Sequence, residues 1–171
     1  MKRPMTLHLL VFFLALACFA CEPGTVHAQQ SSTAQGASAE DSAIRKLIES
    51  KRFDFVAQSA SATRGGTRQL TSYYSLRIKG DTVQAYLPYF GRSYSATLGT
   101  ESGPIDFSTK DFDYSITEGK KGGWNIKIIP SNVNNVRQML LNVSSSGYAN
   151  LQVTSNFRDM ISFYGIVQHI K

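Results

Sequence analysis

The sequence has little of the two side chains on which most metal sites and many nucleophilic sites depend. It contains two cysteines and three histidines in 171 residues. Both cysteines and two of the histidines lie within residues 1–28, which leaves His169, close to the end of the chain. Zinc sites need several Cys or His ligands, and a catalytic triad needs a firmly held imidazole base. We therefore expect no metal ion, no cofactor and no triad chemistry in residues 29–171.

The first segment also lacks an apolar run long enough to cross a membrane. Residues 7–20 are apolar apart from His8. As a helix they would span about 21 Å, against about 30 Å of hydrocarbon in a bilayer. Two basic residues precede the run, and residues 26–28 (VHA) follow it. This layout is typical of a secretory signal peptide, so we expect residues 1–28 to be removed on export.

A lipid anchor is the alternative fate of the same segment. Residues 15–18 (ALAC) and 18–21 (CFAC) resemble the box that precedes a lipidated cysteine, although both lack the usual Leu at the −3 position, three residues before the cysteine. Lipidation at Cys18 or Cys21 would tether the protein to a membrane surface without inserting it. Both routes predict a location in the periplasm or cell envelope.

Positive charge is in excess but is not concentrated. The formal net charge is +6, and the basic residues occur singly or in pairs, as in Lys120-Lys121. No run of five or six basic residues and no nucleic-acid-binding signature is present. We expect no nucleic-acid partner, and only weak attraction to anionic polymers of the envelope.

The remaining chain divides into a linker and one domain. Residues 29–39 are small and polar, which predicts a flexible linker. From Glu40 the apolar residues recur at three- and four-residue spacing, as at Ile44, Leu47 and Ile48, with Ser38 as a candidate cap. This spacing predicts an amphipathic helix of about three turns at the start of a single domain, residues 40–171.

Beyond residue 52 the apolar residues alternate with a period of two, which predicts antiparallel strands with one buried face. Tight hairpins are expected at Gly80-Asp81 and Ser146-Gly147, and a further short strand near residues 105–107. The predicted fold is mainly β, on the border of α+β. It has a short N-terminal helix on a strongly curved antiparallel meander of about eight strands, either barrel-like or two-layered. The eight runs are residues 53–57, 74–78, 83–87, 112–116, 124–128, 139–143, 149–153 and 161–163.

Several segments, in order along residues 40–168, resemble one known family. They include residues 76–83 (LRIKGDTV), 86–92 (YLPYFGR), 121–124 (KGGW), 147–155 (GYANLQVTS) and 161–165 (ISFYG). Together they are similar to the domain-of-unknown-function family 4251, small exported proteins of Bacteroides-type Gram-negative bacteria. The resemblance implies an envelope location and one β-rich domain. It implies no reaction and no functional residue, because the family has no established activity.

The aromatic segment that begins at Tyr86 is the leading candidate for a binding site. Tyr86 falls on the strand face opposite Leu87, and Tyr89, Arg92 and Tyr94 follow it. Tyrosines beside an arginine suit stacking on a sugar ring or holding a carboxylate. The same residues would also serve as core and turn, so the sequence leaves both interpretations open.

Three carboxylates form a second candidate cluster. Asp111 and Asp113 lie two residues apart on a predicted strand, and Asp106 is nearby. The pattern favours a solvated strand face. A calcium cage and the acid pair of a glycosidase are the alternatives.

The sequence as a whole favours a non-enzymatic exported module that binds an envelope protein, a glycan or a small apolar ligand. It predicts no catalytic residue. A carboxylate-based hydrolase and a purely structural envelope component remain the alternatives.

Overall fold

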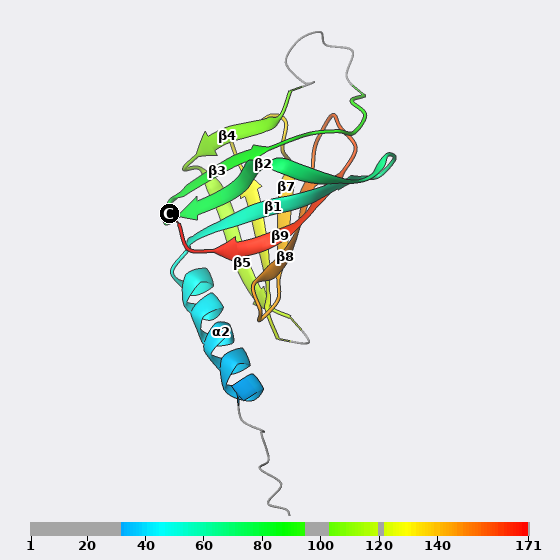
Figure 1. Cartoon of the computed structure of the whole chain (residues 1–171). Coiled ribbons are helices and arrows are strands. Elements are labelled where there is room, and N and C mark those ends of the chain that lie inside the picture. Colours follow the sequence, from blue (N-terminus) through cyan, green and yellow to red (C-terminus); the bar gives the residue numbers. More distant parts are fainter. Residues whose placement is uncertain (1–31, 95–102, 120–121, 171) are drawn as a thin grey trace, which may run out of the picture. The chain divides into compact units, whose positions relative to one another are not determined.

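The computed structural model describes residues 32–94, 103–119 and 122–170, with the backbone alone in residues 32–40. In these ranges one helix, α2 (Ser32–Glu49), precedes nine antiparallel strands (Figure 1). The strands are β1 (Arg52–Ala62), β2 (Gly66–Lys79), β3 (Thr82–Leu87), β4 (Ile105–Thr109), β5 (Phe112–Glu118), β6 (Trp124–Pro130), β7 (Gln138–Val143), β8 (Tyr148–Thr154) and β9 (Ile161–Gln168).

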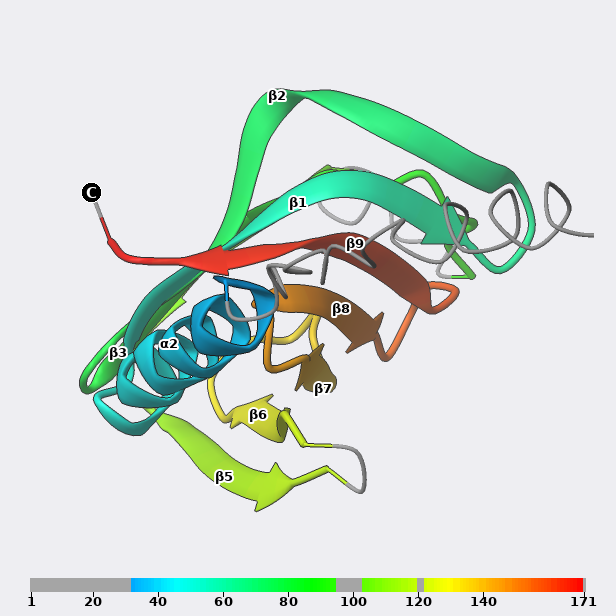
Figure 2. The ribbon, with the colours of Figure 1, turned by 60° about the horizontal axis from the view of Figure 1, so that its bottom comes forward.

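The nine strands form one sheet in the order β4-β3-β2-β1-β9-β8-β7-β6-β5. It consists of two meanders, β1 to β4 and β5 to β9, joined where β1 pairs with β9. The sheet curls strongly around its core (Figure 2) and leaves β4 and β5 as its two edges. The predicted mainly β fold with a barrel-like meander is confirmed. The ninth strand is β4, where the further short strand was expected.

The alternating pattern sets which face of the sheet is buried. Every second residue of β1, β3, β6, β7, β8 and β9 is buried, and together these residues make one hydrophobic core. Trp124, Phe163 and Leu87 lie in this core as their positions predict. Ile116 on the edge strand β5 is the exception, with 37 % of its surface exposed. The opposite residues of each strand face outward.

Helix α2 begins at Ser32, six residues before the predicted Ser38 cap. The helix therefore includes residues 32–39 of the segment predicted to be a flexible linker. Ala34, Ala37 and Ala39 favour helix, whereas Gly36 and the Ser and Thr residues of the same segment do not. The predicted signal peptide, residues 1–28, lies outside the described residues. No helix in the described ranges has the length and apolar character needed to cross a membrane.

The C-terminal half of α2 covers one end of the curled sheet (Figure 2). Ile48 is fully buried in the core, and Ile44 packs against Gly147 in the β7–β8 turn. The Arg45 guanidinium lies 5.4 Å from the ring centre of Trp124 and also contacts Glu118. These contacts join the helix to strands distant in sequence, which fixes it on the sheet.

Strand β2 departs from regular pairing near its middle. Ala57 of β1 pairs with Tyr74, whereas Ser59 pairs with Gln69. A single residue of β1 therefore faces residues 70–73 of β2, and β2 arches away from β1 (Figure 2). An irregularity of this kind redirects side chains. Here it places Tyr73 over the outer face of the sheet.

Candidate functional site

A groove of about 390 Å³ lies on the outer face of β2, β3 and β4. We call it the β2–β4 groove. Its polar floor is set by strand register, because side chains directly opposite each other on neighbouring strands point to the same side. Two rows of residues cross the three strands: Ser75–Tyr86–Asp106 and Arg77–Gln84–Ser108.

Tyrosine rings form the aromatic part of the groove. Tyr86 is 49 % exposed, whereas Leu87 beside it is fully buried, as the predicted alternation requires. The Tyr86 ring stacks on that of Tyr74 with centroids 5.6 Å apart and planes inclined by 28°. Tyr73, brought over the sheet by the irregularity in β2, also lines the groove. A flat aromatic surface therefore stands beside hydrogen-bonding side chains.

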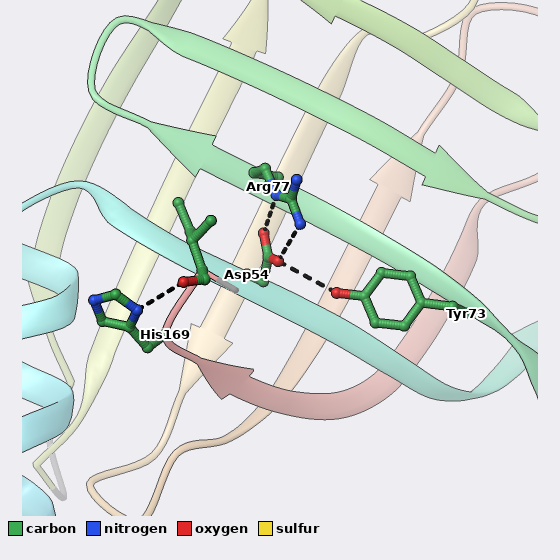
Figure 3. Close-up of polar contacts among 5 residues, drawn as sticks. Asp54, Tyr73, Arg77 and His169 are labelled. Atoms are coloured by element: carbon green, nitrogen blue, oxygen red, sulfur yellow. Dashed lines mark hydrogen bonds and ion pairs between the residues drawn. The ribbon is translucent and has the colours of Figure 1, made fainter.

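One end of the groove is fixed by a buried ion pair (Figure 3). Asp54 is fully buried although it sits on the outer face of β1, because Arg77 and Tyr73 cover it. Arg77 donates from Nε to Asp54 Oδ1 at 2.7 Å and from Nη2 to Oδ2 at 2.6 Å. The Tyr73 hydroxyl donates to Asp54 Oδ2 at 3.2 Å. A two-point guanidinium–carboxylate contact is directional and strong, so it holds the Arg77 plane in place.

The Asp54 carboxylate raises the pKa of Arg77, first through this hydrogen bond, against the lowering effect of burial. The arginine side chain is still 33 % exposed. Its Nη1 makes no hydrogen bond to any residue in the described ranges. Arg77 therefore has N–H donors in a fixed position that a ligand can reach, while its positive charge is paired with the Asp54 carboxylate.

His169 takes no part in this arrangement. Its Nδ1 lies 2.7 Å from the carbonyl oxygen of Ile170, and no interaction joins it to Asp54 or Arg77 (Figure 3). Asp54 is a buried carboxylate like the aspartate of a Ser-His-Asp triad, but His169 does not contact it.

The structure separates the four predicted binding residues. Tyr86 lines the groove, whereas Tyr89, Arg92 and Tyr94 lie in a loop that contacts the β8–β9 connection. The Tyr89 hydroxyl is within hydrogen-bond distance of the carbonyl oxygens of Arg92 (2.8 Å) and Asp159 (3.0 Å). The Tyr94 hydroxyl bonds the Asp159 carboxylate. Tyr89 and Tyr94 thus hold two loops together.

Arg158 completes this loop contact. It is 6 % exposed, its guanidinium carbon lies 4.8 Å from the Tyr89 ring centre, and its Nη1 donates to the carbonyl of Gly103 at 2.8 Å. Burial is the largest cause of a raised Tyr89 pKa. The core-and-turn interpretation therefore describes Tyr89, whereas Tyr86, Arg92 and Tyr94 keep exposed side chains, that of Tyr94 being 69 % exposed.

The three candidate carboxylates do not share a site. Asp106 lies in the β2–β4 groove, Asp111 accepts a hydrogen bond from Asn132 at 2.8 Å, and exposed Asp113 sits on β5 opposite Ile129. Within the described ranges no group of three or more His, Cys, Asp or Glu side chains is placed to hold a metal ion.

Sequence reasoning missed Asp54, Tyr73, Arg77 and Gln84. The local pattern does not single out Asp54, because Asp113 stands between Phe112 and Tyr114 in the same way and is exposed. The alignment of Gln84 with Arg77 follows from the hairpin predicted at Gly80-Asp81, because pairing Lys79 with Thr82 across that turn brings Arg77 opposite Gln84.

The comparisons with known proteins agree with this fold. The sequence profile of a family described as a domain of unknown function (DUF4251) matches residues 35–167. The crystal structure of a DUF4251 family protein from Bacteroides eggerthii DSM 20697 is similar, with a TM-score of 0.58 and 12 % sequence identity. That match covers 79 % of this chain and 91 % of the other. No curated protein matches the sequence.

Proposed function

The chain belongs to the DUF4251 family, and we propose that it is a non-enzymatic, exported module of the cell envelope that binds an acidic glycan in the β2–β4 groove. The observation that carries the proposal is the half-exposed Tyr86 ring beside Arg77, whose plane Asp54 holds. Export is supported by the layout of residues 1–28 and by the resemblance to exported proteins.

An acidic glycan matches the groove chemically. The face of a sugar ring packs on a tyrosine ring, and its hydroxyl groups exchange hydrogen bonds with Gln84, Ser108 and Asp106. A sugar carboxylate accepts N–H bonds from Arg77, whose planar group suits carboxylates. Because Asp54 and Tyr73 already orient the arginine, little side-chain freedom is lost on binding.

The groove supports binding rather than hydrolysis. A glycosidase needs two carboxyl groups about 5 to 9.5 Å apart across the scissile bond. Of the groove's acids, Asp106 is open to a ligand, whereas Asp54 is buried beneath Arg77 and Tyr73. One free carboxylate can accept hydroxyl protons in hydrogen bonds but does not make an acid–base pair.

A binding screen with the full-length protein tests the proposal. The probes are oligogalacturonate, hyaluronate fragments and soluble peptidoglycan fragments. We expect binding to at least one acidic probe without change in its length. Tyr86→Ala should weaken it about tenfold, equivalent to about 1.4 kcal/mol, while Tyr86→Phe retains it.

Tyr148→Ala is the matched control, because Tyr148 is 52 % exposed on strand β8, outside the groove. It should bind the acidic probe as the parent protein does. Failure of every acidic probe to bind, or equal affinity in Tyr86→Ala and the parent, would overturn the proposed site. Shortening of a probe would favour the hydrolase alternative.

A further inference from the structure

A second surface, on the other half of the sheet, carries an unusual arrangement of asparagines. In the register of β6, β7 and β8, Asn125 faces Asn142 and Asn142 faces Asn150. On the next strand, Asn150 faces Tyr164 of β9. Four neighbouring strands therefore contribute one residue each to a continuous row across the sheet, which we call the asparagine row (Asn125, Asn142, Asn150 and Tyr164). At about 4.8 Å between strands the row is roughly 14 Å long.

The three amides of the row are available to a ligand. Asn142 and Asn150 are exposed and Asn125 is half-buried. Neighbouring asparagines often bond one another, but no side-chain hydrogen bond joins these three to each other or to any other described residue. Asparagine is depleted in β-strands, so its recurrence at one level of three paired strands is not a requirement of the sheet.

A pair of tyrosines extends the row. Tyr148 and Tyr164 stack with centroids 6.2 Å apart and planes only 12° from parallel. Their side chains remain 52 % and 48 % exposed. The row and the pair line a shallow hollow of about 540 Å³, bordered at one side by Gly119 and Gly122 of the β5–β6 hairpin. Flat rings and free amides thus share one concave surface, of a volume usual for ligand sites.

Charge is nearly absent from this face. Among the outward-facing residues of β6, β7, β8 and β9, all of which the structure describes, Lys127 is the one charged side chain. The β2–β4 groove, by contrast, holds Arg77 and Asp106. A charged ligand would find no counter-charge in the row and would lose hydration there.

We infer that the asparagine row, with Tyr148, is a second binding site whose ligand is an uncharged oligosaccharide. Each amide offers one acceptor and two donors, which suits adjacent sugar hydroxyl groups, and the stacked tyrosines receive the faces of sugar rings. The register of the strands sets the spacing of the amides, so a short linear chain can lie along the row. This inference rests on side chains outside the groove and does not depend on the proposed function.

NMR of the full-length protein tests the inference directly, because asparagine side-chain NH₂ groups give their own signals. The probes are hexasaccharides of glucose, mannose, xylose and N-acetylglucosamine, each titrated to 10 mM. We expect at least one to shift the NH₂ signals of Asn125, Asn142 and Asn150 in a saturable manner. The affinity should be unchanged in 0.5 M NaCl, because no ion pair is involved.

Substitutions sharpen the test. Asn142→Ala and Tyr164→Ala should each weaken binding at least fivefold, a loss of about 1 kcal/mol. Asn134→Ala, which changes an exposed asparagine outside the row, is the matched control and should leave the affinity unchanged.

Two results would overturn the inference: no probe shifts the three NH₂ signals, or a shift persists with the same affinity in both Asn142→Ala and Tyr164→Ala. Neither result bears on the groove, whose test depends on acidic probes and on Tyr86. The two proposals therefore fail separately.

Discussion

The two halves of the sheet present outer faces of opposite character. The face of β2 to β4 carries charged side chains, and the fully buried Asp54 holds the Arg77 side chain of this face in place. The face of β6 to β9 carries amides and tyrosines with one charged residue, and its asparagine side chains make no hydrogen bonds to described residues. One antiparallel sheet thus supports two kinds of outer face. On one, polar side chains are bonded to each other and stabilise the fold, and on the other the asparagine side chains are not bonded to described residues.

This difference predicts how each face responds to substitution. Removing one member of a buried ion pair leaves the other charged and unsolvated, which costs far more than the pair contributes. Removing an exposed amide costs the fold little. Substitutions in the ion pair of the groove should therefore lower the free energy of unfolding, whereas substitutions in the asparagine row should hardly change it.

The largest expected effect is that of Arg77→Ala, which leaves Asp54 buried without its partner. We expect a loss of about 3 kcal/mol in the free energy of unfolding, measured by urea denaturation. Lys79→Ala, exposed on the same strand, and Asn142→Ala in the row should each change it by less than about 0.5 kcal/mol. A loss below about 1 kcal/mol in Arg77→Ala would remove the distinction between the two faces.

The second largest effect is expected where β1 pairs with β9 and joins the two halves of the sheet. Gly165 of β9 pairs with Ala57 of β1, and a Cβ at this position would collide with the carbonyl oxygen of Val56. The backbone cannot yield as a side chain would. We expect Gly165→Ala to lower the unfolding free energy by about 2 kcal/mol and to weaken ligand binding on both faces.

Gly65→Ala is the control for this joint, because a Cβ there meets only Ala62 at 3.9 Å, an ordinary contact. It should be close to neutral in the same denaturation experiment. Equal stability of the two glycine variants would show that the β1–β9 joint is not tightly constrained.

The smallest expected effect concerns a buried hydroxyl on the second half. The Tyr114 hydroxyl is buried with no hydrogen-bond partner among the described residues, unlike the fully bonded Asp54. Tyr114→Phe removes an unsatisfied group, so we expect a gain of about 1 kcal/mol in unfolding free energy at pH 7. Thermal or urea denaturation measures it.

The same substitution predicts a pH effect. Burial raises the pKa of Tyr114 above its ordinary 10.0, so the folded state keeps the proton that the unfolded state releases. Stability from this group is present below pH 10 and is lost as the pH rises above it. Tyr114→Phe should therefore lose less stability between pH 9 and pH 11 than the parent.

The sequence predicted much of the fold because a period of two translates directly into a buried face. All eight alternating runs are strands, and the short strand expected near residues 105–107 is β4. Residues 32–39, which belong to α2, have no apolar period from which a helix could be predicted. Among the candidate site residues, the sequence placed Tyr86 on the outward face of its strand, because Tyr86 alternates with the buried Leu87.

The sequence by itself determined which side of each strand meets the core and which meets solvent, because that choice depends on local alternation. Only the tertiary structure decided which outward residues became neighbours. Asp54 meets Arg77, and Asn125, Asn142 and Asn150 form a line, because of register between strands that are separate in the chain. A tight turn sets the register of its own hairpin, but the shift in pairing between β1 and β2 and the register across the longer β6–β7 connection depend on packing of the whole core, which no short stretch of sequence contains.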